Sequence, residues 1–463
     1  MANFNLIEML TKQLSRFGEA STTGGDYFDY APGQPNLFLL SRFKMLLVEE
    51  YGVEAGFALY QQTITKQKDA SLKLLPLESH YAYSKAHDSR FHEVITPGRR
   101  FAILPPRVIG DGDHRPLRGV SRSFYLSCLE NAIVRGRSSI VEAPEAALAD
   151  FQDDELARID DEVEFDAAVF HREGERVWLI NTPQPPLEFD EALSLLGCRT
   201  DFFGDWFSDS VRRYVAATLD GRLAAVTVLI DAHMPRTHRE ALELMLTANP
   251  RIVEVEAFQP VRVRKLWWPP GQVYMPFHQI LNARFKWEYL GGIGQDFAPV
   301  ENEMIRRAGL VDAPATGPTR VFLARRHFRH RKLVNHKEIE TIAVSFGFAI
   351  IYTEDLDFVS QARLLRRARW VVAPEGSSLF LATSFMGRRT KLCILNHQQT
   401  EALVLYNSCS GPDFDREIEI TVITGPDAGE IHGRSQDMNY TVDPETFSDF
   451  LIEWFGPHVE TGS

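Results

Sequence analysis

A regular alternation of short apolar runs with longer amphipathic segments, between residues 320 and 396, constrains the fold of this chain more than any other feature. Short apolar runs between turn signals are typical of buried strands, and apolar residues at helical spacing are typical of helices. The predicted strands are 321–324, 349–352, 370–373 and 391–395, and the predicted helices are 337–346, 358–368 and 378–386. Strands that alternate with helices are typical of βα units on a parallel sheet, so this region predicts a compact Rossmann-like domain.

A second alternation lies upstream, with predicted helices at 203–219 and 237–248 and a predicted strand at 224–230. Before it, short strand-like runs between 92 and 180 are separated by Pro, Gly and Asp clusters. A chain of 463 residues is longer than one hydrophobic core usually supports. The sequence therefore predicts two α/β domains in tandem with a cleft between them, and further amphipathic helices at 2–17, 37–66 and 446–455.

The net charge and the cysteine pattern argue against several classes of binding site. A formal net charge of −13 argues against a general nucleic-acid-binding or anionic-membrane-binding surface, because such partners select a basic face. Four scattered cysteines without a CxxC pair predict neither a zinc site nor a disulfide framework. Any anion-binding site on this chain must be local.

We expect this protein to be located in the cytoplasm. No apolar run approaches the ~20 residues that span a bilayer, and charged and polar residues recur throughout the first 20 positions, unlike a signal peptide. The helices at 2–17 and 37–66 have three open roles. They can pack on the body of the protein, which is the commoner outcome, bind a protein partner, or touch the inner face of a membrane. The oligomeric state is not defined by the sequence.

A basic loop follows the first strand of the C-terminal alternation. Residues 325–332, RRHFRHRK, hold four arginines, one lysine and two histidines. Ligands of open α/β sheets bind at the carboxyl ends of strands, and guanidinium groups match phosphate oxygens. A solvated loop that pairs with the acidic surface is the alternative.

A second turn, EGSSLF at 375–380, follows the strand WVVAP. A Gly/Ser turn between a strand and a helix offers backbone N–H groups and hydroxyls to an anion. The alternative is a tight turn in which Ser377 or Ser378 caps the helix. Together with the basic loop, this turn predicts a diphosphate site.

These residues resemble glycosyltransferase family 61, the type found in capsular polysaccharide biosynthesis. The resemblance is carried by Arg325, Arg331 and Asn335 at R-x5-R-x3-N spacing, by Gly347-Phe348, by Gln361, and by the strand and turn WVVAPEGSSLF. Weaker similarities lie in FFGDWFSDSVRRY (202–214), CLENAIVRGRSSIVEA and NYTVDPETFSDFL, so the resemblance covers about 125–455. Glu375 opens a turn that is usually His-Gly-Ala-Gly-Leu-like in the family, and Asp205 stands where the family often has His.

The resemblance implies a GT-B-like fold, with two Rossmann-like domains facing a cleft. The expected boundaries are an N-terminal helical extension at 1–90, an acceptor-side α/β domain at 91–310, a nucleotide-sugar-binding α/β domain at 311–440, and a closing helix with its tail at 441–463. It also implies inverting transfer of a sugar from a nucleoside diphosphate donor to a glycan or other hydroxyl acceptor. The expected donor-binding residues are Arg325, Arg331, Asn335, Gln361, Gly376, Ser377 and Ser378.

Such transfer needs a base for the acceptor hydroxyl and neutralisation of the departing diphosphate. Asp205 is the first candidate base, Asp209 one helical turn later is the reserve, and Glu375 is a further candidate as base or as a ligand of the donor sugar. The alternative for Asp205 is a cap of the helix that begins near Trp206.

Two D-x-D matches, at Asp111 and Asp113 and at Asp355 and Asp357, have the shape that can hold Mg²⁺ or Mn²⁺ on a diphosphate. So short a motif arises readily by chance in an acidic chain, and Asp357 is also a plausible helix cap. We therefore expect no metal and no other cofactor. The aromatic run Trp267-Trp268-Pro269-Pro270 is either an acceptor-facing patch or buried packing.

Two functions follow from these features. The first is a nucleotide-sugar-dependent glycosyltransferase of polysaccharide assembly. The second is a catalytically silent relative that binds nucleotide or glycan as a partner subunit, which the altered residues Asp205 and Glu375 motivate. Nucleic-acid binding through 325–332 is disfavoured by the acidic charge.

Overall fold

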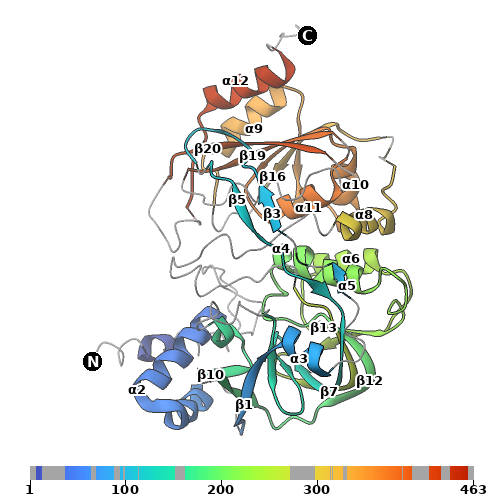
Figure 1. Cartoon of the computed structure of the whole chain (residues 1–463). Helices are drawn as coiled ribbons and strands as arrows, with labels where there is room; N and C mark the ends of the chain where they lie inside the picture. The colour runs from blue at the N-terminus through green and yellow to red at the C-terminus, as the bar shows by residue number, and fades with distance from the viewer. Residues whose placement is uncertain are drawn as a thin grey trace. The chain divides into compact units, whose positions relative to one another are not determined.

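The computed structural model describes residues 7–12, 37–63, 69–87, 94–96, 98, 100–112, 114–151, 162–271, 298–312, 314, 316–326, 331–387, 389–398, 417–428 and 438–456 (Figure 1). By their internal contacts they divide into two compact units. The first unit draws on 1–97, 122–239 and 246–285, and the second on 98–121, 240–245 and 286–463. The chain passes between the units several times, and one of these crossings falls within helix α6 (Arg236–Met245), whose residues from Glu240 to Met245 belong to the second unit.

The first unit is built on a mixed sheet, in which ten strands of the described chain take part. In spatial order they are β10 (Val169–Glu173), β11 (Arg176–Asn181), β1 (Ser71–Ser79), β9 (Ala147–Ala149), β8 (Val141–Glu142), β7 (Ser127–Arg135), β15 (Pro260–Trp268), β12 (Leu187–Ser194), β13 (Thr227–Asp231) and β14 (Ile252–Val255). The last four are parallel to one another. The chain therefore runs outward from β12 to β14 and returns to the other side of β12 as β15, which makes a topological switch point between β12 and β15.

The helical segment predicted at 203–219 crosses from β12 to β13. It consists of α4 (Phe203–Asp205), a π-helical stretch η4 (Trp206–Val211) and α5 (Arg212–Ala217). Its apolar side chains Trp206, Phe207, Val211 and Tyr214 are fully buried. The strand predicted at 224–230 is β13, and the helix predicted at 237–248 is α6.

Helix α2 (Leu37–Thr63) packs on the first unit, so the packing role expected for this segment is confirmed. Leu40, Phe43, Leu47 and Tyr60 are buried in a cluster that includes Phe170 of β10. The helix is broken at its middle by Gly52, whose φ of 77° is readily available only to glycine. Residues 1–90 are not wholly helical, because β1 lies between α2 and α3 (His80–His87) and pairs with β11 and β9.

The second unit is built on a sheet in which every neighbouring pair is parallel. In spatial order its described strands are β17 (Ala349–Tyr352), β16 (Arg320–Ala324), β18 (Trp370–Pro374), β19 (Thr390–His397), β20 (Ile418–Gly425) and β4 (Arg107–Ile109). Its helices include α8 (Ala298–Arg307), α9 (His336–Ser345), α10 (Phe358–Arg367), α11 (Ser378–Phe385) and α12 (Pro444–Phe455). The alternation predicted from 320 to 396 is therefore confirmed, with small shifts at the element ends.

Helices cover both faces of this sheet (Figure 1). Alternate residues of a strand point to opposite faces. Phe322 and Ala324 of β16 accordingly share a buried cluster with Ile339 of α9 and Phe447 of α12. Helices α10 and α11 pack against each other, with Phe358 and Phe385 in edge-to-face contact. The chain is thus a mixed α/β protein with large parallel sheet regions.

Two details differ from the sequence-based expectation. Of the strand-like runs between 92 and 180, the run at 139–141 overlaps a strand only at the first residue of β8 (Val141–Glu142), and the backbone N–H of Ser139 donates to Asp166 Oδ2 instead. The segment 98–121, expected in the first domain, belongs to the second unit, because β4 extends its sheet beside β20. Among the described residues, no helix combines the length and the apolar character needed to cross a membrane.

Candidate functional site

The candidate site of the second unit lies at a switch point of its sheet. From β16 the chain runs to β17 on one side, and it then crosses to β18 on the other side. Ligands of open α/β sheets bind at the carboxyl ends of the two strands that flank such a point. Here β16 leads directly into Arg325, and β18 leads directly into Glu375 and Gly376. The sequence-predicted residues of both loops therefore meet at this point.

Glu375 connects the two arginines. Arg325 Nη1 donates to the carbonyl oxygen of Glu375 at 3.1 Å, and Arg331 Nη1 donates to its carboxylate Oε2 at 2.5 Å. Burial, followed by the nearby charge of Arg331, lowers the pKa of Arg325 from its ordinary value. Arginine nevertheless remains a cation at physiological pH. The three side chains together carry two positive charges and one negative charge.

Gly376 leaves space for Arg325. A Cβ atom at this position would lie 2.8 Å from Arg325 Nη1 and 3.2 Å from its Cζ. The guanidinium group therefore packs against the Gly376 backbone. Gly376 also has a positive φ of 159°, so both the packing of Arg325 and the backbone conformation favour glycine at this position.

Tyr440 forms hydrogen bonds beside both loops of the site, and the sequence analysis did not identify it as a site residue. Its fully buried hydroxyl donates to Leu395 O at 2.7 Å, and the backbone N–H of Glu375 donates to the same oxygen at 2.9 Å. Tyr440 N donates to Lys332 O at 2.9 Å, next to Arg331, whose φ of 54° is uncommon for a residue other than glycine. Burial raises the pKa of Tyr440, so its hydroxyl stays protonated.

The other predicted donor-binding residues lie nearby but differ in their contacts. Ser377 is exposed and Ser378 half-exposed at the start of α11, and Ser377, at the N-cap position, makes no side-chain cap hydrogen bond. Asn335 Nδ2 donates to Val442 O at 2.7 Å, and its Oδ1 accepts from Val442 N at 3.2 Å. Gln361 Nε2 donates to two backbone carbonyls of the loop between β17 and α10, both at 3.0 Å. The side chains of Asn335 and Gln361 therefore hold loops in place.

Both aspartates of the second D-x-D match have protein partners. Asp355 forms an ion pair with Arg326, and Asp357 caps α10 by accepting from Ser360 N at 2.7 Å. The cap expected at Asp357 is confirmed. Asp113 of the first match and His327 and His330 of the basic loop lie outside the described residues.

The first candidate base, Asp205, lies in the first unit, within the helical segment after β12. Its carboxylate is 2.8 Å from Arg199 Nη2, and the side chain is 29% exposed. It makes no side-chain cap hydrogen bond, so the alternative reading of Asp205 as a helix cap is wrong. Burial raises the pKa of Asp205, with Arg199 acting in the opposite direction.

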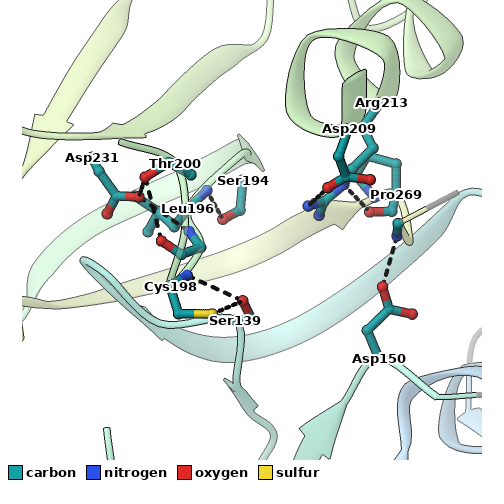
Figure 2. A network of polar contacts seen from close by, with 12 residues as sticks. Ser139, Asp150, Ser194, Leu196, Cys198, Thr200, Asp209, Arg213, Asp231 and Pro269 are labelled. Atoms are coloured by element: carbon teal, nitrogen blue, oxygen red, sulfur yellow. Dashed lines mark hydrogen bonds and ion pairs between the residues drawn. The ribbon is translucent and has the colours of Figure 1, made fainter. Parts of the chain in front are cut away.

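The reserve base, Asp209, lies near the switch point of the first unit. Its carboxylate is 3.4 Å from Arg213 Nη1, and Arg213 Nε donates to Pro269 O at 2.8 Å, directly after β15. The following turn is fixed by Asp150, which accepts from Gly271 N at 2.7 Å (Figure 2). Asp209 is thus placed at the carboxyl end of β15 with 35% of its side chain exposed.

A buried network around Asp231 organises the loop that carries Arg199, and sequence analysis missed it (Figure 2). Asp231 accepts from Arg137 N at 2.5 Å, from Gly197 N at 3.1 Å and from Thr200 Oγ1 at 2.5 Å. Burial raises its pKa to about 6, against the effect of Arg137. The sequence signal that could have identified Asp231 is an acidic residue directly after a predicted apolar strand.

The aromatic run after 266 is buried packing. Trp267 and Trp268 are 7% and 3% exposed, and Trp268 packs on His80 with 3.9 Å between ring centroids. The acceptor-facing patch considered from the sequence is therefore wrong, because neither ring is offered to solvent.

The fold and the cationic switch point define an α/β protein with a candidate site for an anionic ligand at its strand ends. Residues 203–393 match the family model described as Glycosyltransferase 61. Over this segment the match confirms the resemblance to glycosyltransferase family 61 that was drawn from the sequence. The segment includes each of the ten candidate site residues. No curated protein matched the chain.

Proposed function

We propose that this protein is an inverting glycosyltransferase that transfers a sugar from a nucleoside diphosphate donor to a hydroxyl of a glycan or another acceptor. The family match supports the glycosyltransferase class. The observation that carries the donor assignment is the meeting of Arg325, Arg331 and Gly376 at the switch point between β16 and β18. The proposal includes a GT-B-like arrangement with an N-terminal helical extension, a role in polysaccharide biosynthesis of the capsular type, and a cytoplasmic location.

The chemistry requires charge neutralisation on the donor side. The acceptor oxygen attacks the anomeric carbon, the bond from that carbon to the diphosphate oxygen breaks, and the electron pair leaves with the diphosphate. Arg325 and Arg331 would stabilise this developing negative charge, because preorganised cations act strongly where charge develops. Ser377 and Ser378, at the start of α11, would add donors.

The acceptor hydroxyl must lose its proton to a base. Asp205 and Asp209 of the first unit are the candidates, and both belong to the segment that contains the π-helical stretch. Such stretches occur frequently at functional sites. A base contributes typically ~10²–10⁴ in rate.

Donor binding is tested with single arginine variants. Arg325→Ala and Arg331→Ala should each weaken the binding of the preferred nucleoside diphosphate by about 10- to 100-fold, the size of a lost charge-assisted hydrogen bond. Calorimetric titration over a panel of nucleoside diphosphates measures this. Arg369→Ala is the matched control, because Arg369 is exposed just before the amino end of β18. Unchanged affinity in both site variants, with the fold intact, would overturn the donor site.

The catalytically silent alternative has its own supporting observation. Asp205 Oδ2 already has a protein partner, Arg199 Nη2 at 2.8 Å, with which an acceptor hydroxyl would have to compete. A silent relative would bind nucleoside diphosphate without turnover. Release of nucleoside diphosphate from a panel of nucleotide sugars, in the presence of glycan acceptors, separates the two functions.

A further inference from the structure

Glu375 is held by its backbone on both sides, so its side chain is the part that can move. Its N–H donates to Leu395 O at 2.9 Å, and its carbonyl oxygen accepts from Arg325 at 3.1 Å. The carboxylate reaches Arg331 Nη1 at 2.5 Å, and the two side chains are 18% and 30% exposed. The carboxylate therefore lies at the rim of the site, within reach of solvent.

The backbone beside Arg331 is restrained as well. The N–H of the next residue, Lys332, donates to Asn439 Oδ1 at 2.9 Å, and Lys332 O accepts from the backbone N–H of Tyr440 at 2.9 Å. Arg331 itself has a φ of 54°, a conformation that persists only where the surroundings determine it. An incoming anion therefore meets a guanidinium group on a restrained backbone, and the partner of that group is a partly exposed carboxylate.

Carboxylate and phosphate oxygens are alternative partners of one guanidinium group. From these contacts we propose that Glu375 is an internal counter-ion of the donor site. Its carboxylate holds Arg331 in the ligand-free protein, and a phosphate oxygen of the donor replaces it on binding. The inference rests on the proposed function for the identity of the ligand. It makes Glu375 a positioning residue, which sets the affinity for the diphosphate through Arg331.

The charges around the pair agree with this role. Arg331 pairs with Glu375 and lies near the positive charge of Arg325, and Glu354, after β17, contributes a second negative charge near Arg325. With Glu375 in place the three-residue cluster has a net charge of +1. Without that carboxylate the same two arginines would present +2 to a diphosphate.

The test uses inorganic pyrophosphate and the preferred nucleoside diphosphate as separate probes of the full chain. Glu375→Gln keeps the size and a hydrogen-bond acceptor but removes the charge. We expect both probes to bind about 5- to 10-fold more tightly, as for one unit charge removed from a partly exposed site. Glu354→Gln is the matched control, since it removes an equal charge at the end of the neighbouring strand β17, and we expect less than about a 2-fold change.

A double-mutant cycle separates this role from a merely structural one. Arg331→Ala should weaken pyrophosphate binding more in the Glu375→Gln background than in the wild type, because Arg331 there has no competing carboxylate. Unchanged or weaker binding by Glu375→Gln would overturn the proposal, as would an equal effect of Glu354→Gln. If pyrophosphate binds more tightly to Glu375→Gln while no nucleoside diphosphate binds either protein, the counter-ion is upheld and the proposed function fails.

Discussion

At the scale of single residues, the contact between Gly376 and Arg325 makes a sharp prediction. In Gly376→Ala the new Cβ would lie 2.8 Å from Arg325 Nη1, so the guanidinium group must leave its position. We expect nucleoside diphosphate affinity to fall at least about 10-fold, as for the loss of one charge-assisted hydrogen bond. The displaced group is the end of a flexible side chain, but the φ of 159° adds backbone strain, so we expect the unfolding free energy to fall by about 1–3 kcal/mol. Calorimetric titration and chemical denaturation measure the two quantities.

Gly309→Ala is the control for this variant. Gly309 has a φ of 67° and no atom within 4 Å of its hypothetical Cβ. The substitution should cost about 1–2 kcal/mol of stability through backbone strain and leave nucleotide affinity unchanged. Wild-type affinity in Gly376→Ala would show that the position of Arg325 is unimportant for binding.

The residues that sequence analysis found are those whose chemistry follows a predicted strand end. Arg325, Glu375 and Gly376 belong to this group, since a basic loop and a glycine turn after strands are local patterns. Tyr440 and Asp231 were missed, because their roles depend on partners far away in the chain. A local pattern cannot state which distant backbone groups a side chain will contact.

The same reason explains the contacts of Asn335 and Gln361. Their spacing from Arg325 and Arg331 predicts donor binding through the family resemblance. In the structure the amide of Asn335 spans both backbone groups of Val442, which lies 107 residues away in sequence. A test of their donor-binding role must therefore separate lost loop anchoring from lost ligand contact.

At the scale of elements, the segment from α4 to α5 concentrates the candidate bases. If Asp205 is the base, its raised pKa places the acid limb of kcat/KM at a higher pH than an exposed aspartate would, because only the deprotonated form accepts a proton. Arg199→Ala removes the cation that lowers this pKa, so the limb should move to still higher pH. Asp205→Asn should lower the rate ~10²–10⁴-fold. Steady-state transfer assays across pH measure all three effects.

Asp209→Asn is the matched control, since it changes a carboxylate on the same helical segment that is paired with Arg213 instead. If the ion pair between Arg199 and Asp205 is only structural, the expected result is different. Arg199→Ala and Asp205→Asn would then each lose about 1 kcal/mol of stability or less, as partly exposed pairs do, and the pH profile of the transfer rate would be unchanged. If Asp205→Asn keeps its rate while Asp209→Asn loses it, the base is Asp209.

Helices and strands were predicted well where strands alternate regularly with helices along the chain. They were predicted less well where a strand pairs with another that is distant in sequence. Strand β17 has the predicted bounds, because a short apolar run between turn residues is typical of a strand. Strand β4 joins the distant β20, and β1 interrupts the helical N-terminal region to pair with β11 and β9. Pairing between strands so distant in sequence has no signature in the local pattern of apolar and polar residues, so it cannot be predicted from that pattern.

At the scale of the whole molecule, the charge is acidic overall and basic at one place. The net charge of −13 disfavours broad contact with nucleic acid or anionic lipid. The arginines after β16 meet Glu375 and Gly376 at the switch point because β16 and β18 are neighbours in space, although β17 and two helices separate these strands in sequence. The parallel topology therefore creates a local cationic site on an acidic protein.

The last prediction concerns divalent metals. We propose that transfer does not require one, because two guanidinium groups can neutralise the diphosphate and the nearby carboxylates have other partners. Asp355 pairs with Arg326, and Asp357 caps α10, so a cation bound by these two aspartates would have to break both contacts.

Exhaustive chelation should leave the transfer rate within about 2-fold of the untreated protein, whereas loss of a metal that acts as a Lewis acid removes several kcal/mol of transition-state stabilisation. Asp355→Asn should likewise keep its activity and lose only the exposed ion pair with Arg326. Activity abolished by the chelator and restored by Mn²⁺ or Mg²⁺, together with an inactive Asp355→Asn, would assign these aspartates to a metal.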